Sequence, residues 1–222
     1  MLFRSADLSS RLAAIETSCL CDARRGIRVL DPAIRPLTPG LKIAGPACTV
    51  SCRNDFLGVL EALQAARPGD VLVVDGGAER LAVAGELFAT EARRKGLAGI
   101  VVDGAVRDVA TIRTLGLPVY ARSTSPAAGT VAAPGRVQQP VHCGGVDIAP
   151  GDLVIGDDDG IVVLTEAELD ELLPIAEGIQ AKESEALARM AARQSLFDLT
   201  NLEEHLAARK AGRPSRFGFT PS

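Results

Sequence analysis

Two short aliphatic segments that both end in Asp-Gly limit the fold of this chain more than any other feature. Val71–Val74 leads into Asp75-Gly76, and the segment 98–102 leads into Asp103-Gly104. Continuous apolar runs of this length are typical of strands that are covered on both faces. Helical and extended patterns then alternate at 85–95, 108–115 and 118–121. This order predicts an α/β layer with parallel strands, in which ligands gather at the carboxyl ends of the strands.

Shorter elements are expected on both sides of this layer. The apolar spacing predicts a helix at 7–18, a strand at 47–53 and a helix at 55–66. From Val131 to Leu164, short apolar runs alternate with turn sequences, which indicates a β-rich portion rather than another helical crossover.

The C-terminal quarter has a helical pattern. Thr165–Glu168 has the sequence of a capping box, and Pro174 is expected to break or kink the helix that begins there. The tail from Gly212 is expected to be loose or to contact a partner. We therefore expect one domain at 1–164, followed at 165–222 by helices and a tail that belong to that domain or to an oligomer contact.

Composition excludes several classes of function. Hydrophobic residues make up 47% of the chain, but aromatic residues only 3%, so stacking platforms for single-stranded nucleic acid are not expected. The net charge of -4 provides no general attraction for phosphate backbones. The N-terminal sequence lacks the apolar run of a signal peptide, and no stretch is long enough to span a bilayer. A cytoplasmic protein without nucleic-acid or membrane partners is expected.

The five cysteines are expected to be reduced thiols. Their number is odd, and their spacing is not that of a structural zinc site. Cys48 and Cys52 fall on one face of an expected strand, which favours buried and inert side chains.

The helix expected from Gly85 begins with a possible anion site. The first amides of a helix have no partner within it, and the helix dipole places partial positive charge there. A carboxylate could accept hydrogen bonds from these amides, and glycine at the start allows its close approach. Most helix N-termini bind only water, so this pattern alone leaves both interpretations open.

Arg107-Asp108 offers two interpretations as well. Asp108 stands where a helix is expected to begin, so it could be an N-cap beside a structural arginine. Alternatively, Asp108 could provide an oxygen ligand for a hard divalent cation that keeps several waters, as Mg²⁺ does. Arg107 would then bind a substrate carboxylate through its planar guanidinium group.

Several motifs in register resemble the RraA-like family. The sequence VVDGG-x2-R-x4-GELF occupies 73–88, and GIVVDGAVRD-x3-I-x3-G-x-PV occupies 99–119. The resemblance extends over about 17–164 and includes GPA-x-TV from Gly45 and PGDLVIGDDDGIVV from Pro150. This family contains 4-hydroxy-4-methyl-2-oxoglutarate and 4-carboxy-4-hydroxy-2-oxoadipate aldolases, together with the regulator of ribonuclease E activity. The resemblance implies a swivelling β/β/α fold of the α/β class, here with a C-terminal helical extension.

The resemblance also implies roles for particular residues. Asp108 would bind the metal, Mg²⁺ or Mn²⁺, and Arg107 would contact the substrate. The backbone at Gly85, Leu87 and Phe88 would hold the pyruvyl carboxylate, and Glu86 would lie near metal-bound water. Homotrimers or hexamers are implied, with sites at subunit borders to which a neighbouring chain contributes an acidic residue, for which Glu183 is our candidate. Ala84 replaces the Trp that many relatives carry before this motif, which changes the expected pocket shape.

The implied activity is that of a class II aldolase, a carbon–carbon lyase. It would cleave a 4-hydroxy-2-oxo dicarboxylic acid to pyruvate, with a divalent metal stabilising the enolate. Oxaloacetate decarboxylation passes through the same enolate and would follow from the same site. The chain's lysines lie outside the strand-end motifs, which argues against a Schiff-base aldolase. The alternative is a non-catalytic RraA-like regulator that binds and inhibits a ribonuclease.

Two other patterns are interpreted as structural. His142 lacks the neighbours expected of a phosphorylated histidine, and Asp157–Asp159 lies between strands, unlike a calcium loop. The chain has neither a GxGxxG nor a P-loop sequence, so no nucleotide site is expected.

Overall fold

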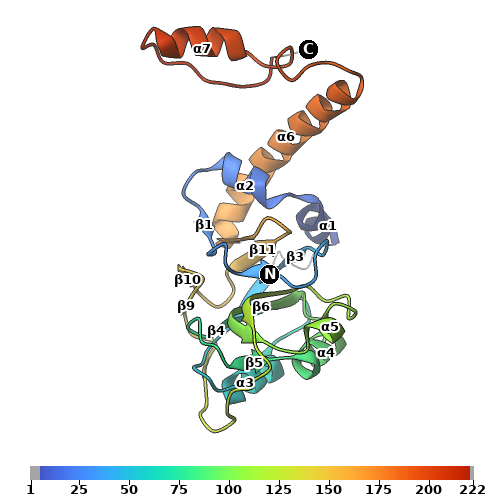
Figure 1. Ribbon diagram of the computed structural model, residues 1–222, viewed down its shortest axis with the longest axis vertical. Helices are drawn as coiled ribbons and strands as arrows, with labels where there is room; N and C mark the ends of the chain where they lie inside the picture. The colour runs from blue at the N-terminus through green and yellow to red at the C-terminus, as the bar shows by residue number, and fades with distance from the viewer. Residues whose placement is uncertain (1–5, 221–222) are drawn as a thin grey trace.

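The architecture is a large curled sheet covered by helices, seen in a computed structural model that describes residues 6–220 (Figure 1). The main path of the sheet has the order β1-β12-β11-β3-β4-β6-β7-β2, while β5 pairs with β6 and β8 with β3. Its strands are β1 (Arg28–Val29), β2 (Arg35–Pro36), β3 (Ile43–Ser51), β4 (Val71–Asp75), β5 (Ala82–Ala84), β6 (Gly99–Val106), β7 (Val119–Thr124), β8 (Arg136–Val137), β11 (Leu153–Gly156) and β12 (Ile161–Leu164). A separate hairpin consists of β9 (Val141–Cys143) and β10 (Val146–Ile148).

The strand β3 joins two halves of this sheet. Its first residues pair with β11 antiparallel, and its later residues pair with β4 parallel. β6 pairs parallel with β4, and β7 pairs parallel with β6, which confirms the predicted parallel layer and the α/β class. In this register Asp75 lies directly beside Asp103, so the two Asp-Gly turns do share one rim.

The helices α3 (Leu57–Ala65), α4 (Glu86–Arg94) and α5 (Val109–Ile112) lie at the end of the body opposite the C-terminus (Figure 1). α3 and α4 bury alanine and aliphatic side chains against β3, β4 and β6, and Ile112 of α5 joins the same core. Alanine at Ala62, Ala89 and Ala92 allows the helices to pack closely on the sheet. The core of this chain, which has few aromatic residues, is therefore filled by small and aliphatic side chains.

Two further core clusters complete the fold. One lies on the opposite face of the parallel strands, where the β9–β10 hairpin covers it. The other lies under α2 (Thr17–Ala23) and the start of α6 (Glu166–Ala191), against β11 and β12. The predicted capping box is confirmed, since the Thr165 side chain accepts from the amide of Glu168 and the Glu168 side chain accepts from the amide of Thr165.

Three sequence-based expectations at the ends of the chain were wrong or incomplete. The N-terminal segment forms two helices, α1 (Ala6–Ala14) and α2, rather than one helix at 7–18. α6 continues through Pro174 without a break, because Leu172, Leu173 and Ala176 on both sides of the proline are buried in the core. α7 (Leu202–Lys210) ends before the tail that was expected from Gly212, and Phe219 in this tail forms a bridge with Thr200, which precedes α7.

All five cysteines are free thiols, as expected. Burial raises the pKa of Cys48 and of Cys52 to about 11, which makes these thiols poor nucleophiles. Cys21 differs from the expectation because it is only partly buried. Within residues 6–220, no helix combines the length and apolar character that a bilayer span requires.

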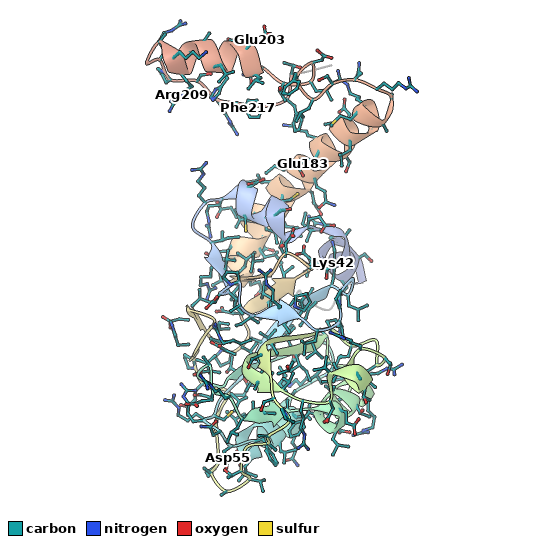
Figure 2. All side chains as sticks on the ribbon, viewed as in Figure 1. Lys42, Asp55, Glu183, Glu203, Arg209 and Phe217 are labelled. Atoms are coloured by element: carbon teal, nitrogen blue, oxygen red, sulfur yellow. The ribbon has the colours of Figure 1, made fainter. Side chains whose placement is uncertain are left out.

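The carboxylate of Asp55 stabilises a loop that lies beside β5. Its carboxylate accepts hydrogen bonds from the Thr130 hydroxyl at 2.6 Å and from the amides of Ala132 and Ala133. The amide of Ala82 in β5 in turn donates to the carbonyl oxygen of Ala127 in the same loop. Figure 2 shows Asp55 at the end of the body farthest from α7.

We expect Asp55→Asn to lower the melting temperature at neutral pH more than at pH 3. These hydrogen bonds hold the pKa of Asp55 well below its usual value, led by the bond from Thr130. A depressed pKa adds stability above the unfolded pKa of about 4, and this stability is lost as pH falls through the folded value. Melting curves between pH 7 and pH 3 test this, with the exposed Asp170→Asn as control. If the melting-temperature difference between the wild type and Asp55→Asn grows toward low pH, the prediction is contradicted.

Candidate active site

The turn from β5 into α4 presents free amides. Gly85 is the N-cap residue and offers no side-chain cap. The amide of Ala89 donates to the carbonyl oxygen of Gly85, whereas those of Leu87 and Phe88 have no acceptor among the described residues. The Phe88 ring packs edge-on against Phe56 at 5.9 Å, which helps to fix the first turn. Two backbone donors at a helix N-terminus are thus available to an anion.

Asp108 occupies the N-cap position of α5, but its side chain makes no capping hydrogen bond. Its Oδ2 atom instead accepts from the amide of Glu86 at 3.3 Å, across 22 residues of sequence. The backbone of Asp108 is left-handed, with φ at 61°. This conformation is uncommon for residues other than glycine, although aspartate adopts it more readily than most. The Asp108 side chain thus does not cap α5, and its role as a metal ligand stays a prediction.

The backbone of Gly85 lies in close contact with the side chains of Arg107 and Asp108. Nε of Arg107 lies 3.4 Å from Oδ2 of Asp108. A Cβ atom added to Gly85 would lie 2.6 Å from the same oxygen and 3.0 Å from Cγ of Arg107. The backbone of Gly85 is extended and open to any residue, so glycine is required here for space alone. The close neighbours at this glycine are side chains of the chain itself, and the expected approach of a substrate carboxylate stays a prediction.

The charged side chains at this turn are accessible to solvent. The side chains of Arg107 and Asp108 are 44% and 36% exposed, and Glu86 beside them is partly exposed. The Leu87 side chain is 72% exposed and contributes an apolar surface next to these charged groups. The arrangement therefore combines one cation, two carboxylates and two free amides at one rim.

The donor set fits one kind of metal ion. No three His, Cys, Asp or Glu side chains within residues 6–220 form a metal-binding group. Asp108 could supply one carboxylate, and its Oδ1 atom has no hydrogen-bond partner among the described residues. Mg²⁺ is commonly held by one or two carboxylates and keeps several waters. A hydrated Mg²⁺ or Mn²⁺ completed by substrate oxygens fits these residues, whereas a structural zinc ion does not.

The two Asp-Gly turns at the same rim have a structural role. Asp75 is paired with Arg53 at 2.9 Å and accepts from the Ser51 hydroxyl. Asp103 is paired with Arg122 and accepts from the amide of Gly144. Sequence reasoning missed both arginines, although Arg122 is the one charged residue within the strand-like segment 118–124. The Asp75 and Asp103 carboxylates therefore stabilise the strand ends. Of these three aspartates, Asp108 is the one whose carboxylate is accessible to solvent.

Glu183 lies far from the other candidate residues within one chain. It sits on α6 beside α2, where Cys19 Sγ lies 3.5 Å from its Oε2 atom. Figures 1 and 2 place this part of α6 toward the opposite end of the molecule from α4 and α5. Glu183 could therefore reach an Arg107-Asp108 site only in another subunit, and its role stays a prediction.

Comparison with known proteins identifies the family. The family model described as "RraA-like: Aldolase/RraA" matches residues 17–163. A protein of Halalkalibacterium halodurans named "Putative 4-hydroxy-4-methyl-2-oxoglutarate aldolase" is 38% identical over 177 residues, which is 79% of this chain and 84% of that protein. The chain belongs to the RraA-like family.

Solved structures agree with this assignment. The RNA-processing inhibitor RraA from Thermus thermophilis superimposes with a TM-score of 0.64 and 32% identity, over 68% of this chain and 93% of that one. Streptomyces coelicolor RraAS2, described as an unusual member of the RNase ES inhibitor RraA family, gives 0.71 and 30% identity, over 84% and 98%. The fold is therefore the expected RraA-like one, and the named relatives include both aldolases and ribonuclease inhibitors.

Proposed function

We propose that this protein is a divalent-metal-dependent aldolase that cleaves a 4-hydroxy-2-oxo dicarboxylic acid to pyruvate. The observation that carries the proposal is the Asp108 side chain, which leaves its capping position and turns toward the amides of α4. The aldolase name of the 38% identical relative supports it. Oxaloacetate decarboxylation at the same site belongs to the proposal, because both reactions pass through a pyruvate enolate.

Arg107 and the start of α4 would bind the substrate's 2-oxo acid end. The guanidinium of Arg107 can donate two parallel hydrogen bonds to a carboxylate. The free amides of Leu87 and Phe88 can donate to the same group, aided by the dipole of α4. Both sets of donors are fixed in place by the β5–β6 pairing that precedes them. Little reorganisation is then needed when negative charge develops.

Asp108 would hold the cation, with substrate oxygens and water as the remaining ligands. When bound, Mg²⁺ or Mn²⁺ supplies Lewis-acid stabilisation of the charge that develops on the 2-oxo oxygen. Glu86 stands one residue after Gly85, where its carboxylate can orient a water that accepts the proton of the 4-hydroxyl group. The neighbouring chain's acidic residue, for which we propose Glu183, would assist this transfer.

The exposed Leu87 favours a site at a subunit border. In a site between two chains, the neighbouring subunit would cover the Leu87 residue, which is 72% exposed beside Arg107 and Asp108. We therefore propose a homotrimer, or a pair of trimers, in which each site lies between two chains.

A ribonuclease regulator is the second candidate, supported by the names of the Thermus and Streptomyces relatives. Such a regulator needs a surface for its partner but has no need of a strained, uncapped Asp108. The two candidates thus differ in what they require of this residue.

A coupled pyruvate-release assay tests the proposal. We expect pyruvate from 4-hydroxy-4-methyl-2-oxoglutarate and from oxaloacetate with Mg²⁺ or Mn²⁺, and its loss on adding EDTA. Excess Mg²⁺ should restore the activity, which separates metal removal from denaturation. If neither substrate yields metal-dependent pyruvate, the aldolase proposal fails.

A further inference from the structure

Asp55 is a buried carboxylate that the proposed reaction does not use. The residue is only 4% exposed, yet no basic side chain within residues 6–220 forms an ion pair with it. Removing a charge from water is costly unless hydrogen bonds replace the lost hydration. Both oxygens are used for this purpose: Oδ1 accepts from the amide of Leu57 at 2.9 Å, and Oδ2 accepts from three donors in the segment 130–133. One carboxylate thus joins the start of α3 to that segment.

The segment 127–130 lies between Asp55 and β5 and is bonded to both. On one side, Thr130 forms backbone hydrogen bonds with the two residues that flank Asp55, at 2.8 and 2.9 Å. On the other side, Ala82 of β5 forms two backbone hydrogen bonds with this segment. A Cβ atom added to Gly129 would overlap a carbonyl oxygen next to Asp55, so only glycine allows this close approach. Since β5 has three residues and leads directly into the turn before α4, its outer edge depends on this segment.

Phe56, the residue after Asp55, contacts α4 directly. Its ring packs edge-on against that of Phe88, with the centroids 5.9 Å apart and the planes at 84°. Phe88 supplies one of the two amides of the proposed carboxylate site. Figures 1 and 2 place Asp55 at the end of the body where α3 and α4 lie. Residues 55 and 56 therefore hold the turn from two sides, through β5 and through the first turn of α4.

Arg107 and Asp108 are held in a different way. They follow β6, which has eight residues and pairs with β4 on one edge and with β7 on the other. The position of β6 therefore depends less on β5 than the turn into α4 does. Loss of the contacts made by Asp55 should displace the amides of this turn more than the two charged side chains.

From these contacts we propose that Asp55, Phe56 and Thr130 are positioning residues for substrate binding. They fix the first turn of α4 so that the amides of Leu87 and Phe88 point toward the substrate's carboxylate, and they do not touch the substrate themselves. The inference rests on the proposed function, because it assumes that this turn binds the 2-oxo acid.

Steady-state pyruvate release from 4-hydroxy-4-methyl-2-oxoglutarate by Thr130→Val tests the positioning role. Valine keeps the shape of threonine but cannot donate to Asp55. We expect KM to rise about tenfold and kcat to stay within about twofold of wild type, because a misplaced donor weakens binding of substrate and transition state alike. Thr130→Ser keeps the hydroxyl group and should restore the wild-type KM. Phe56→Leu removes the ring contact with Phe88 and should also raise KM.

Thr49→Val is the matched control. The Thr49 hydroxyl donates to the carbonyl oxygen of Gln139 at 2.7 Å, so this variant also removes one hydroxyl hydrogen bond, but from within β3. Thr49 is fully buried, so valine there should destabilise the fold at least as much as Thr130→Val while leaving KM unchanged. A wild-type KM in folded Thr130→Val would overturn the proposal, as would an equal rise of KM in Thr49→Val.

Hydrogen–deuterium exchange separates this result from failure of the aldolase proposal. Amides within 82–92 should exchange several-fold faster in Thr130→Val than in the wild type, because the contacts that order this region are weakened. Unchanged exchange there overturns the positioning role. If the wild type releases no pyruvate, the aldolase proposal fails, and the exchange rates still show whether Thr130 and Asp55 order this turn.

Discussion

Asp108→Asn is expected to reduce pyruvate release by about 10²- to 10³-fold while leaving the melting temperature nearly unchanged. Loss of Lewis-acid stabilisation costs several kcal/mol, and each 1.36 kcal/mol corresponds to a tenfold change in rate. Asparagine has the same shape and tolerates the left-handed backbone of this position. The melting temperature should be nearly unchanged because Asp108 does not cap α5, and the side-chain oxygen of asparagine can still accept the hydrogen bond from the amide of Glu86. Initial rates with Mg²⁺ and a thermal melt, on the same preparation, provide the two readouts.

The outcome distinguishes the two interpretations of Asp108. Replacing an N-cap residue with alanine costs about 1 kcal/mol of stability, whereas asparagine caps a helix as well as aspartate does. On the N-cap interpretation, Asp108→Asn would therefore leave turnover and stability unchanged, and only Asp108→Ala would lower the melting temperature. Asp31→Asn is a suitable control, since Asp31 is also exposed and paired with an arginine, at 2.8 Å from Arg122. Full activity in Asp108→Asn would contradict a catalytic role for this residue and support a structural one.

Gly85→Ala is expected to lower kcat on the order of 10²-fold, because it displaces both Arg107 and Asp108. The new Cβ atom would lie 2.6 Å from Oδ2 of Asp108, closer than atoms can approach without moving. Displacements near 1 Å in a catalytic group can cost this much. The atoms that must move are ends of partly exposed side chains, so the fold should tolerate the change while the site does not. Steady-state kinetics and a thermal melt measure the two effects separately.

Gly178→Ala is the matched control for this substitution. A Cβ atom at Gly178, inside α6, meets nothing within 4 Å. Alanine there should raise stability by roughly 0.5–1 kcal/mol, since glycine is unfavourable inside a helix, and should not change activity. Wild-type kcat in Gly85→Ala would mean that the close packing of these three residues is irrelevant to catalysis.

The sequence predicted the parallel layer and its rim because buried strands have a strong local signature. The Val71–Val74 run, the Asp75–Asp103 pairing of turns and the capping box at Thr165 all follow from short-range patterns. The candidate site was also accessible to sequence reasoning, since Gly85, Glu86, Arg107 and Asp108 stand at strand and helix ends. The family resemblance then gave those residues their expected roles.

Other features depended on contacts between distant parts of the chain. Pro174 does not break α6, because burial of its neighbours against β11 and β12 outweighs the lost hydrogen bond. The left-handed backbone of Asp108 has no local signal, and neither does its turn toward Glu86. The ion pair between Arg122 and Asp103 was also not predicted, because it joins residues of neighbouring strands that are 19 residues apart in the sequence.

Binding of Mn²⁺, followed by the electron paramagnetic resonance signal of the free ion, tests the central claim most directly. The wild-type protein with oxalate, a planar mimic of the pyruvate enolate, is expected to bind one Mn²⁺ per chain. Asp108→Asn under the same conditions is expected to bind none at comparable concentrations. Equal Mn²⁺ affinity in the two proteins would contradict the assignment of Asp108 as the metal ligand.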